Sequence, residues 1–403
     1  MASAITKQSR IFTLIGTIIT QFALGSVYTW SLFNSPLADK LSEPVNRVAF
    51  SFGILSLALA VASSLSGKLQ ERFGVRKVTI GAGLLLGASL LLTAHASNLI
   101  LLYVFAGLLV GFADGTGYLL TLSNCVKFFP ERKGLASACA IGAYGLGSLG
   151  FKYINMYLLT HMGLDMTFDV WGAIAMVMVI IGGLMMTDAP KQQVSANNSA
   201  EQRDYTLAEA MKCSQFWLLA LVFLTVCMSG LYVIGVAKDI GQDYVHLSVT
   251  TAASAVAIIA VANLSGRLVL GILSDRIART KVIAIALAVC LVGVCLLLFA
   301  HQSMLSFYVA VACIAFSFGG TITVFPSLVS DFFGLNNLAK NYGLIYLGFG
   351  IGSFVGSIVA SVFGGFIATF YLMFALLVVS LIIALTIKIP GQTGIKQQII
   401  MAS

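Results

Sequence analysis

The sequence predicts an all-α membrane protein with twelve transmembrane helices in two pseudo-symmetric six-helix bundles. Of its 403 residues, 59% are hydrophobic and only 9% are charged, which lies outside the range of soluble domains. Runs of about 18 or more mostly apolar residues recur along the whole chain, and each can span a hydrocarbon core of about 30 Å as a helix. An internal repeat, described below, predicts the division into two bundles.

Twelve apolar segments are expected to be the membrane-spanning helices. The first follows ten residues that are too polar to begin a cleaved signal peptide, and its apolar run is too long for one. The later segments are separated by short polar or basic loops. The expected helices cover residues 11–33, 47–66, 78–96, 99–126, 134–158, 169–187, 215–237, 249–273, 282–300, 304–328, 340–363 and 366–388.

The positive charges set the orientation of the chain. The net charge is +8, and eighteen of the 23 Lys and Arg residues lie on one side of the membrane if both termini are cytoplasmic. Only Lys40, Arg47 and Lys238 fall outside, and Lys152 and Arg267 lie within helices. Basic loops remain in the cytoplasm, so we expect a multi-pass protein of a bacterial inner (plasma) membrane rather than a partner of nucleic acid.

The two halves of the chain repeat each other. "GKLQERFGVRK" (67–77) aligns with "GILSDRIARTK" (271–281) at an offset of 204, and "FADGTGYLLTLSNCVKFF" (112–129) aligns with "FSFGGTITVFPSLVSDFF" (316–333) at the same offset. "GLGS" (145–148) aligns with "GIGS" (350–353) at 205. The repeat predicts an N-terminal bundle over 1–187, a cytoplasmic linker over 188–213, a C-terminal bundle over 214–390 and a cytoplasmic tail over 391–403.

The first pair of repeated segments forms a basic motif, with one copy at 67–77 and the other at 271–281. Its first copy resembles the signature loop between helices 2 and 3 of the major facilitator superfamily. Glu71 stands where that family usually has aspartate, and the second copy has Ala278 in place of the second glycine. The resemblance implies the major facilitator fold, with substrate bound near the midplane between the halves. It also implies a latch at the cytoplasmic helix ends in the outward-open state; the alternative is that the basic residues only fix orientation. The latch residues would be Glu71, Arg72, Arg76, Asp275 and Arg276.

Other segments resemble the oxalate/formate antiporter family. "GSVYTWSLFNSPL" (25–37) looks like the helix 1 signature of that family, and "FFPERKGLASACAIGAYGLGS" (128–148) is similar to its helix 4 to 5 junction. The similarity continues through "GRLVLGILSDR", "FPSLVSDFFG" and "KNYGLIYLGFG", so it covers most of the chain. This resemblance implies a secondary transporter of small carboxylates.

Three ionisable residues are expected inside the membrane: Asp114, Lys152 and Arg267. A charge there costs at least about 2.5–3.5 kcal/mol, so each is a candidate functional residue. Counted along the helices from the loop near 128–133, Asp114 lies about 21 Å and Lys152 about 28 Å away. We therefore expect the two to form an ion pair that serves substrate binding and, through Asp114, proton coupling. The alternative is a pair that serves only assembly.

Arg267 is the strongest candidate ligand for a carboxylate. It lies four residues before Gly271, where an arginine of the resembling family faces the substrate. A guanidinium stays charged and binds a carboxylate with two parallel hydrogen bonds. The alternative is an arginine that reaches toward the cytoplasmic surface, since it lies only about 12 Å from Asp275 along the helix.

The charge balance favours a monocarboxylate. Antiporters of the resembling family that carry oxalate have a second cation in helix 11, where this chain has Phe349. If Asp114 neutralises part of the charge of Lys152, the site carries close to one net positive charge, which favours a monocarboxylate over a dianion.

Aromatic residues with polar tips suit the clamping of a small organic anion. Tyr28, Tyr118 and Tyr144 match pocket positions of the resembling family, and Trp30 belongs to its helix 1 signature. For Trp30 and Tyr144, ordinary helix packing is an equal alternative. The four histidines are dispersed, and no nucleophile triad or Walker motif is visible, so no catalytic residue, metal or cofactor is expected, and the protein is not expected to be an enzyme.

The function expected from the sequence is secondary transport of small carboxylates of the pyruvate, lactate, formate or oxalate type. Transport would be coupled to protons or to a counter-anion, with the lipid bilayer around a monomer. Two alternatives are proton-coupled drug efflux on the same fold and a transporter-like receptor that binds a metabolite without moving it.

Overall fold

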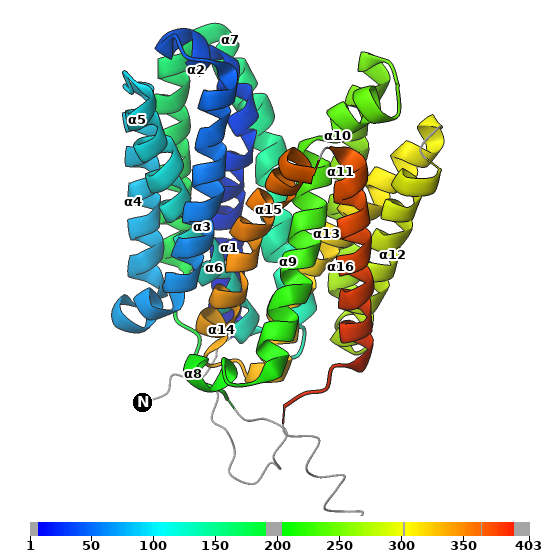
Figure 1. The fold of residues 1–403 in the computed structure, drawn as a ribbon. Coiled ribbons are helices and arrows are strands. Elements are labelled where there is room, and N and C mark those ends of the chain that lie inside the picture. The colour runs from blue at the N-terminus through cyan, green and yellow to red at the C-terminus, as the bar shows by residue number, and fades with distance from the viewer. Residues whose placement is uncertain (1–6, 191–203, 301–302, 364, 391–403) are drawn as a thin grey trace, which may run out of the picture. The chain divides into compact units, whose positions relative to one another are not determined.

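The computed structural model describes residues 7–190, 204–300, 303–363 and 365–390, and all regular elements in these ranges are helical (Figure 1). The predicted all-α class is therefore confirmed. The predicted linker is described only at its two ends, because residues 191–203 lie outside the described residues. The predicted tail over 391–403 lies outside them as well.

The first half of the chain forms helices at all six predicted spans. The first helix changes to a tighter 3₁₀ helix where the predicted signature begins, and a π-helical stretch precedes the helix that carries Asp114. The elements are α1 (Lys7–Gly25), η1 (Ser26–Leu32), α2 (Asn34–Leu41), α3 (Val45–Phe73), α4 (Val75–Ala94), α5 (Leu99–Leu102), η2 (Tyr103–Leu109), α6 (Val110–Phe128) and α7 (Lys133–Met185).

The second half repeats this arrangement with short helices between the spans. Its elements are α8 (Leu207–Ala210), α9 (Ser214–Gly235), α10 (Ala237–Asp239), η3 (Ile240–Tyr244), α11 (Val249–Leu273), α12 (Arg279–Phe299), α13 (Met304–Phe333), α14 (Leu338–Ile345), α15 (Leu347–Phe363) and α16 (Phe366–Thr386).

Within the described ranges, ten helices are long and apolar enough to cross a membrane, whereas the sequence predicts twelve spans. The difference has two sources. α7 contains two predicted spans, joined at Gly163, whose φ of 77° breaks the helix and is accessible to glycine without strain. The predicted span 340–363 is divided between α14 and α15 at Tyr346. All twelve predicted segments are thus helical.

The chain forms two compact units. Unit 1 comprises residues 1–130 and 139–190, and unit 2 comprises residues 131–138 and 191–403. The beginning of α7 therefore belongs with unit 2, although the sequence analysis places it in the N-terminal bundle.

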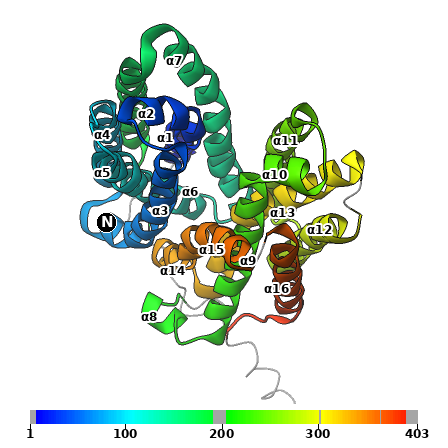
Figure 2. The ribbon, with the colours of Figure 1, turned by 45° about the horizontal axis from the view of Figure 1, so that its top comes forward.

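The internal repeat is visible as the same helix contact in both units. In unit 1, α3 packs on α6 so closely that a Cβ on Gly115 would lie 2.0 Å from the carbonyl oxygen of Leu59. In unit 2, α11 packs on α13, and a Cβ on Gly319 would lie 2.3 Å from the carbonyl oxygen of Asn263 (Figure 2). Both partners are displaced by 204 residues, the offset of the sequence repeat. Small residues at these points let the helix backbones touch, as in membrane helix pairs.

Candidate functional site

Unit 1 contains a carboxylate surrounded by tyrosines. Asp114 of α6 is fully buried, and the hydroxyl of Tyr144 on α7 donates a hydrogen bond to its Oδ2 over 2.8 Å. The Tyr144 ring lies edge-on to two further rings, with centroid distances of 5.2 Å to Tyr118 and 5.5 Å to Tyr28. The structure therefore brings Asp114 and the three predicted tyrosines together in one group, the Asp114 cluster.

Local backbone contacts position this cluster. A Cβ on Gly25, the first residue of the helix 1 signature, would lie 1.9 Å from the carbonyl oxygen of Tyr144. The missing side chain lets the end of α1 approach α7, and the following 3₁₀ turn places Tyr28 beside Tyr144. Edge-to-face contacts between such rings add about 0.5–1.5 kcal/mol to their burial.

Asp114 has spare hydrogen-bonding capacity. Its Oδ1 is buried and has no hydrogen-bond partner in the described part of the chain. A buried carboxylate oxygen without a donor is destabilising, and such groups are few in native proteins. The free oxygen can bind a proton or accept a hydrogen bond from a ligand.

The predicted ion pair between Asp114 and Lys152 is absent. Lys152 is exposed on α7, and within the described ranges it forms no hydrogen bond or ion pair. Tyr144 occupies the place that the prediction gave to the lysine. Lys152 follows it by eight residues, which is roughly 12 Å along the helix and about 80° around its axis. The two charges are therefore separated, and this expectation of the sequence analysis was wrong.

Trp30 belongs to a different group. Its side chain is 1% exposed, its Nε1 donates to the hydroxyl of Ser51 over 3.0 Å, and its ring packs against Phe33 and Phe168. These contacts favour the packing role over substrate contact.

Gln21 is a buried polar residue that the sequence analysis missed. From α1, its Nε2 donates to the carbonyl oxygen of Tyr118 and to the hydroxyl of Thr121, each over 2.9 Å. It thereby fixes the α6 backbone at one tyrosine of the Asp114 cluster. The signal was a single amide in the apolar run "IITQFALG", which a search restricted to charged residues overlooks.

In unit 2, Arg267 lies half-buried on α11. The residue before it, Gly266, packs on the backbone of Phe316 in α13, so the position of Arg267 is fixed by a close helix contact. Phe349, at the predicted place of the missing cation, is 3% exposed and stacks on Tyr346 with a centroid distance of 5.2 Å.

The second copy of the basic motif (271–281) contacts the first turn of α7 through the side chain of Asp275. The two carboxylate oxygens of Asp275 accept hydrogen bonds from the backbone N–H groups of Gly134 and Leu135, each over 2.8 Å. Asp275 also pairs with Arg279 over 2.9 Å, and Lys133 pairs with Asp331 over 3.0 Å. A carboxylate at a helix N-terminus satisfies unpaired N–H groups and the helix dipole. The sequence analysis counted Arg279 and Lys133 only among the basic residues that set the orientation of the chain, and it did not predict these ion pairs.

The first copy of the basic motif (67–77) forms hydrogen bonds with an aspartate that the sequence analysis did not identify. Asp188 accepts hydrogen bonds from the backbone N–H of Val75 over 3.0 Å and from Gln70 over 3.1 Å, and Arg76 donates to the carbonyl oxygen of Met186 over 3.3 Å. Glu71, Arg72 and Arg276 are exposed. Unit 2 has a similar contact, since Asp204 accepts a hydrogen bond from the backbone of Asn336 over 3.1 Å.

Within the described ranges, no group of three or more His, Cys, Asp or Glu side chains could hold a metal ion.

The repeated helical units, with their long apolar helices, define a multi-pass membrane protein. The chain belongs to the Major Facilitator Superfamily, whose sequence profile matches residues 13–237 and 229–398. The predicted superfamily is therefore confirmed.

Individual proteins resemble the chain over most of its length. It is 66% identical over 347 residues to the uncharacterized MFS-type transporter YhjX of Escherichia coli (strain K12), covering 86% of each protein. It is 26% identical to the oxalate:formate antiporter of Oxalobacter formigenes, covering 84% of this chain and 81% of that protein. Monocarboxylate transporter 13 of Rattus norvegicus is 23% identical, covering 80% of this chain and 74% of that protein. The predicted similarity to the oxalate/formate antiporter family is confirmed.

A solved structure shows the same fold. The proton:xylose symporter XylE bound to 6-bromo-6-deoxy-D-glucose superposes with a TM-score of 0.72 at 13% identity, covering 93% of this chain and 95% of that chain.

Proposed function

We propose that the protein is a secondary active transporter of small organic carboxylates that works by alternating access, with monocarboxylates favoured. Membership of the superfamily supports transport, and the relatives named as an oxalate:formate antiporter and a monocarboxylate transporter support the substrate class. Transport would be driven by protons or by anion exchange, in a bacterial inner membrane with both termini cytoplasmic.

The observation that carries this proposal is the exposed side chain of Lys152 on α7. It is a cation within a helix of a membrane protein, it is exposed, and no counter-charge of the described residues holds it. An ionisable residue at such a position is by default a functional one, because its cost needs a compensating role. An anion is the ligand that compensates it.

The Asp114 cluster is the proposed proton-coupling group. A proton at Oδ1 of Asp114 would remove the negative charge and leave the hydrogen bond from Tyr144 to Oδ2 in place. The cluster can therefore take up and release one proton without rearranging the tyrosine rings around it. Tyr28 and Tyr118 offer the ligand apolar area with polar tips.

Arg267 remains the proposed carboxylate ligand of unit 2, because a guanidinium on a rigid helix can offer two parallel hydrogen bonds. Glu71, Arg72, Arg76, Asp275 and Arg276 remain the proposed gating residues. The cap that Asp275 provides to α7 supports a role in stabilising one conformation.

The proposal is tested by uptake into proteoliposomes that contain the purified protein. Labelled formate, lactate, pyruvate and oxalate are supplied separately, either with an inward proton gradient or with unlabelled anion inside. We expect at least one monocarboxylate to accumulate under one driving force and oxalate to accumulate less. Failure of all four anions under both driving forces, with the protein folded and inserted, would contradict the proposal.

A further inference from the structure

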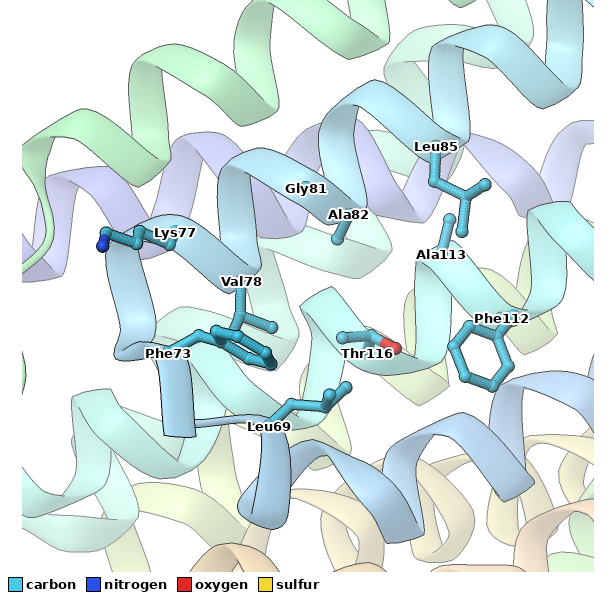
Figure 3. A pocket seen from close by; sticks show the side chains of 10 residues that line it. All are labelled: Leu69, Phe73, Lys77, Val78, Gly81, Ala82, Leu85, Phe112, Ala113 and Thr116. Carbon is cyan, nitrogen blue, oxygen red and sulfur yellow. The ribbon is translucent and has the colours of Figure 1, made fainter. Parts of the chain in front are cut away.

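Unit 1 carries an apolar groove that the proposed transport function does not use. It has a volume of about 320 Å³ and lies between the end of α3, the first turns of α4 and the first turns of α6 (Figure 3). Its lining includes Leu69, Phe73, Val78, Leu85 and Phe112. Of the ten lining residues, only Lys77 and Thr116 have polar atoms in their side chains.

The groove is open on the outside of helices that cross the membrane. α3, α4 and α6 all belong to candidate membrane spans. Phe73 is 48% exposed, and among the described residues no atom outside the neighbouring turns of α4 lies within 4 Å of the place that a Cβ on Gly81 would occupy. The groove therefore has room beside Gly81 for an apolar group that comes from outside the protein.

Positive charge lies at one end of the groove. In Figure 3, Lys77 stands at the end opposite Leu85 and Phe112, and its amine points away from the apolar side chains. The guanidinium of Arg72 lies over the ring of Phe73, 5.2 Å from its centroid. Lys77 and Leu85 are eight residues apart on α4, so the groove extends roughly 12 Å from the cationic end.

We propose that this groove binds an acyl chain of an anionic glycerophospholipid, with the phosphate of its headgroup against Lys77. The apolar walls match the acyl chain, and the lysine at the end matches the headgroup, since lysine at a membrane surface attracts anionic lipid. Thr116 is 5% exposed and its hydroxyl has no hydrogen-bond partner among the described residues, but an acyl chain needs none, so the hydroxyl is not required for binding.

Native mass spectrometry of the full-length protein in detergent tests the proposal. Phosphatidylglycerol and phosphatidylcholine with the same acyl chains are added at equal concentration, and the lipid retained is measured. We expect phosphatidylglycerol to be retained about fivefold more than phosphatidylcholine, the effect of one basic residue beside an anionic headgroup. Lys77→Ala should abolish this preference, while Lys68→Ala, which removes an exposed lysine near the end of α3 that does not line the groove, should keep it.

Filling the groove separates a bound acyl chain from lipid adsorbed by charge alone. The Cβ added by Gly81→Leu meets no described atom outside the neighbouring turns of α4, so the fold should be retained, and the added side chain should occupy the groove and displace the lipid. Gly235→Leu is the matched control, because Gly235 is a helical glycine of unit 2 whose Cβ position is also open. Thr116→Val should retain lipid as the unmodified protein does.

Three results would overturn the proposal: equal retention of both lipids by the unmodified protein, undiminished retention by Gly81→Leu, or loss of retention in Thr116→Val. The last would indicate a ligand that accepts a hydrogen bond inside the groove rather than an acyl chain. Thermal unfolding of each variant shows that the comparison is made between folded proteins.

Discussion

Because Asp114 contacts Tyr144 and is separated from Lys152, we expect its contribution to stability to be coupled to that of Tyr144 and not to that of Lys152. Asp114 and Tyr144 are 0% and 7% exposed and share a hydrogen bond of 2.8 Å, while the second oxygen of Asp114 has no partner in the part of the chain that the structure describes. Tyr144→Phe keeps the ring contacts but leaves both carboxylate oxygens unsatisfied, which should lower the free energy of unfolding by about 1–3 kcal/mol. Asp114→Ala should have a comparable effect, because it leaves the buried hydroxyl of Tyr144 without its hydrogen-bond acceptor.

Two double-mutant cycles test this difference. Once both partners are gone neither is left unsatisfied, so Tyr144→Phe with Asp114→Ala should cost less than the sum of the single changes by about 1–3 kcal/mol. Lys152→Met with Asp114→Ala should be additive within about 0.3–0.5 kcal/mol, because the two side chains are not in contact. Unfolding is followed in detergent by tryptophan fluorescence. Coupling of Asp114 with Lys152 but not with Tyr144 would refute the assignment of partners.

Three further predictions concern the remaining polar groups. Arg267→Lys should raise the dissociation constant for the transported carboxylate about tenfold or more, because an ammonium cannot form the two-pronged contact; unchanged affinity by calorimetry would remove Arg267 from the site. Glu71→Gln and Asp275→Asn should shift the balance between inward-open and outward-open states without changing which anion is carried, and unaltered spin-label distance distributions would contradict the latch. Asp188→Ala should lower the free energy of unfolding by about 1 kcal/mol, the value of a lost helix cap, and a stability equal to that of the unmodified protein would show that its contact with Val75 contributes nothing.

Much of the fold could be predicted because it depends on patterns that can be read directly along the sequence. Apolar runs give the membrane segments, and the offset of 204 residues reappears as the matched contacts of Gly115 with Leu59 and of Gly319 with Asn263. Breaks within segments were not predicted. The division between α14 and α15 has no proline or charge to mark it.

The site could be predicted only in part. The three tyrosines and Asp114 do meet, but the partner of Asp114 was misassigned, because helix rise gives the depth of a residue and not the direction in which its side chain points. A search for charged partners also overlooks neutral donors such as Tyr144 and Gln21, which satisfy a buried acceptor without adding a second charge.

The most direct test of the central claim compares carboxylate uptake by three proteins in proteoliposomes, using the anion that the unmodified protein accumulates fastest. Lys152→Met removes the exposed intramembrane cation, and Lys238→Met removes an exposed lysine from the short helix α10 as the matched control. Loss of a charge-assisted hydrogen bond to the carboxylate should reduce uptake at low substrate concentration about tenfold to a hundredfold in Lys152→Met, while Lys238→Met should transport as the unmodified protein does. Uptake by Lys152→Met at the unmodified rate would contradict the claim that this lysine serves an anionic substrate.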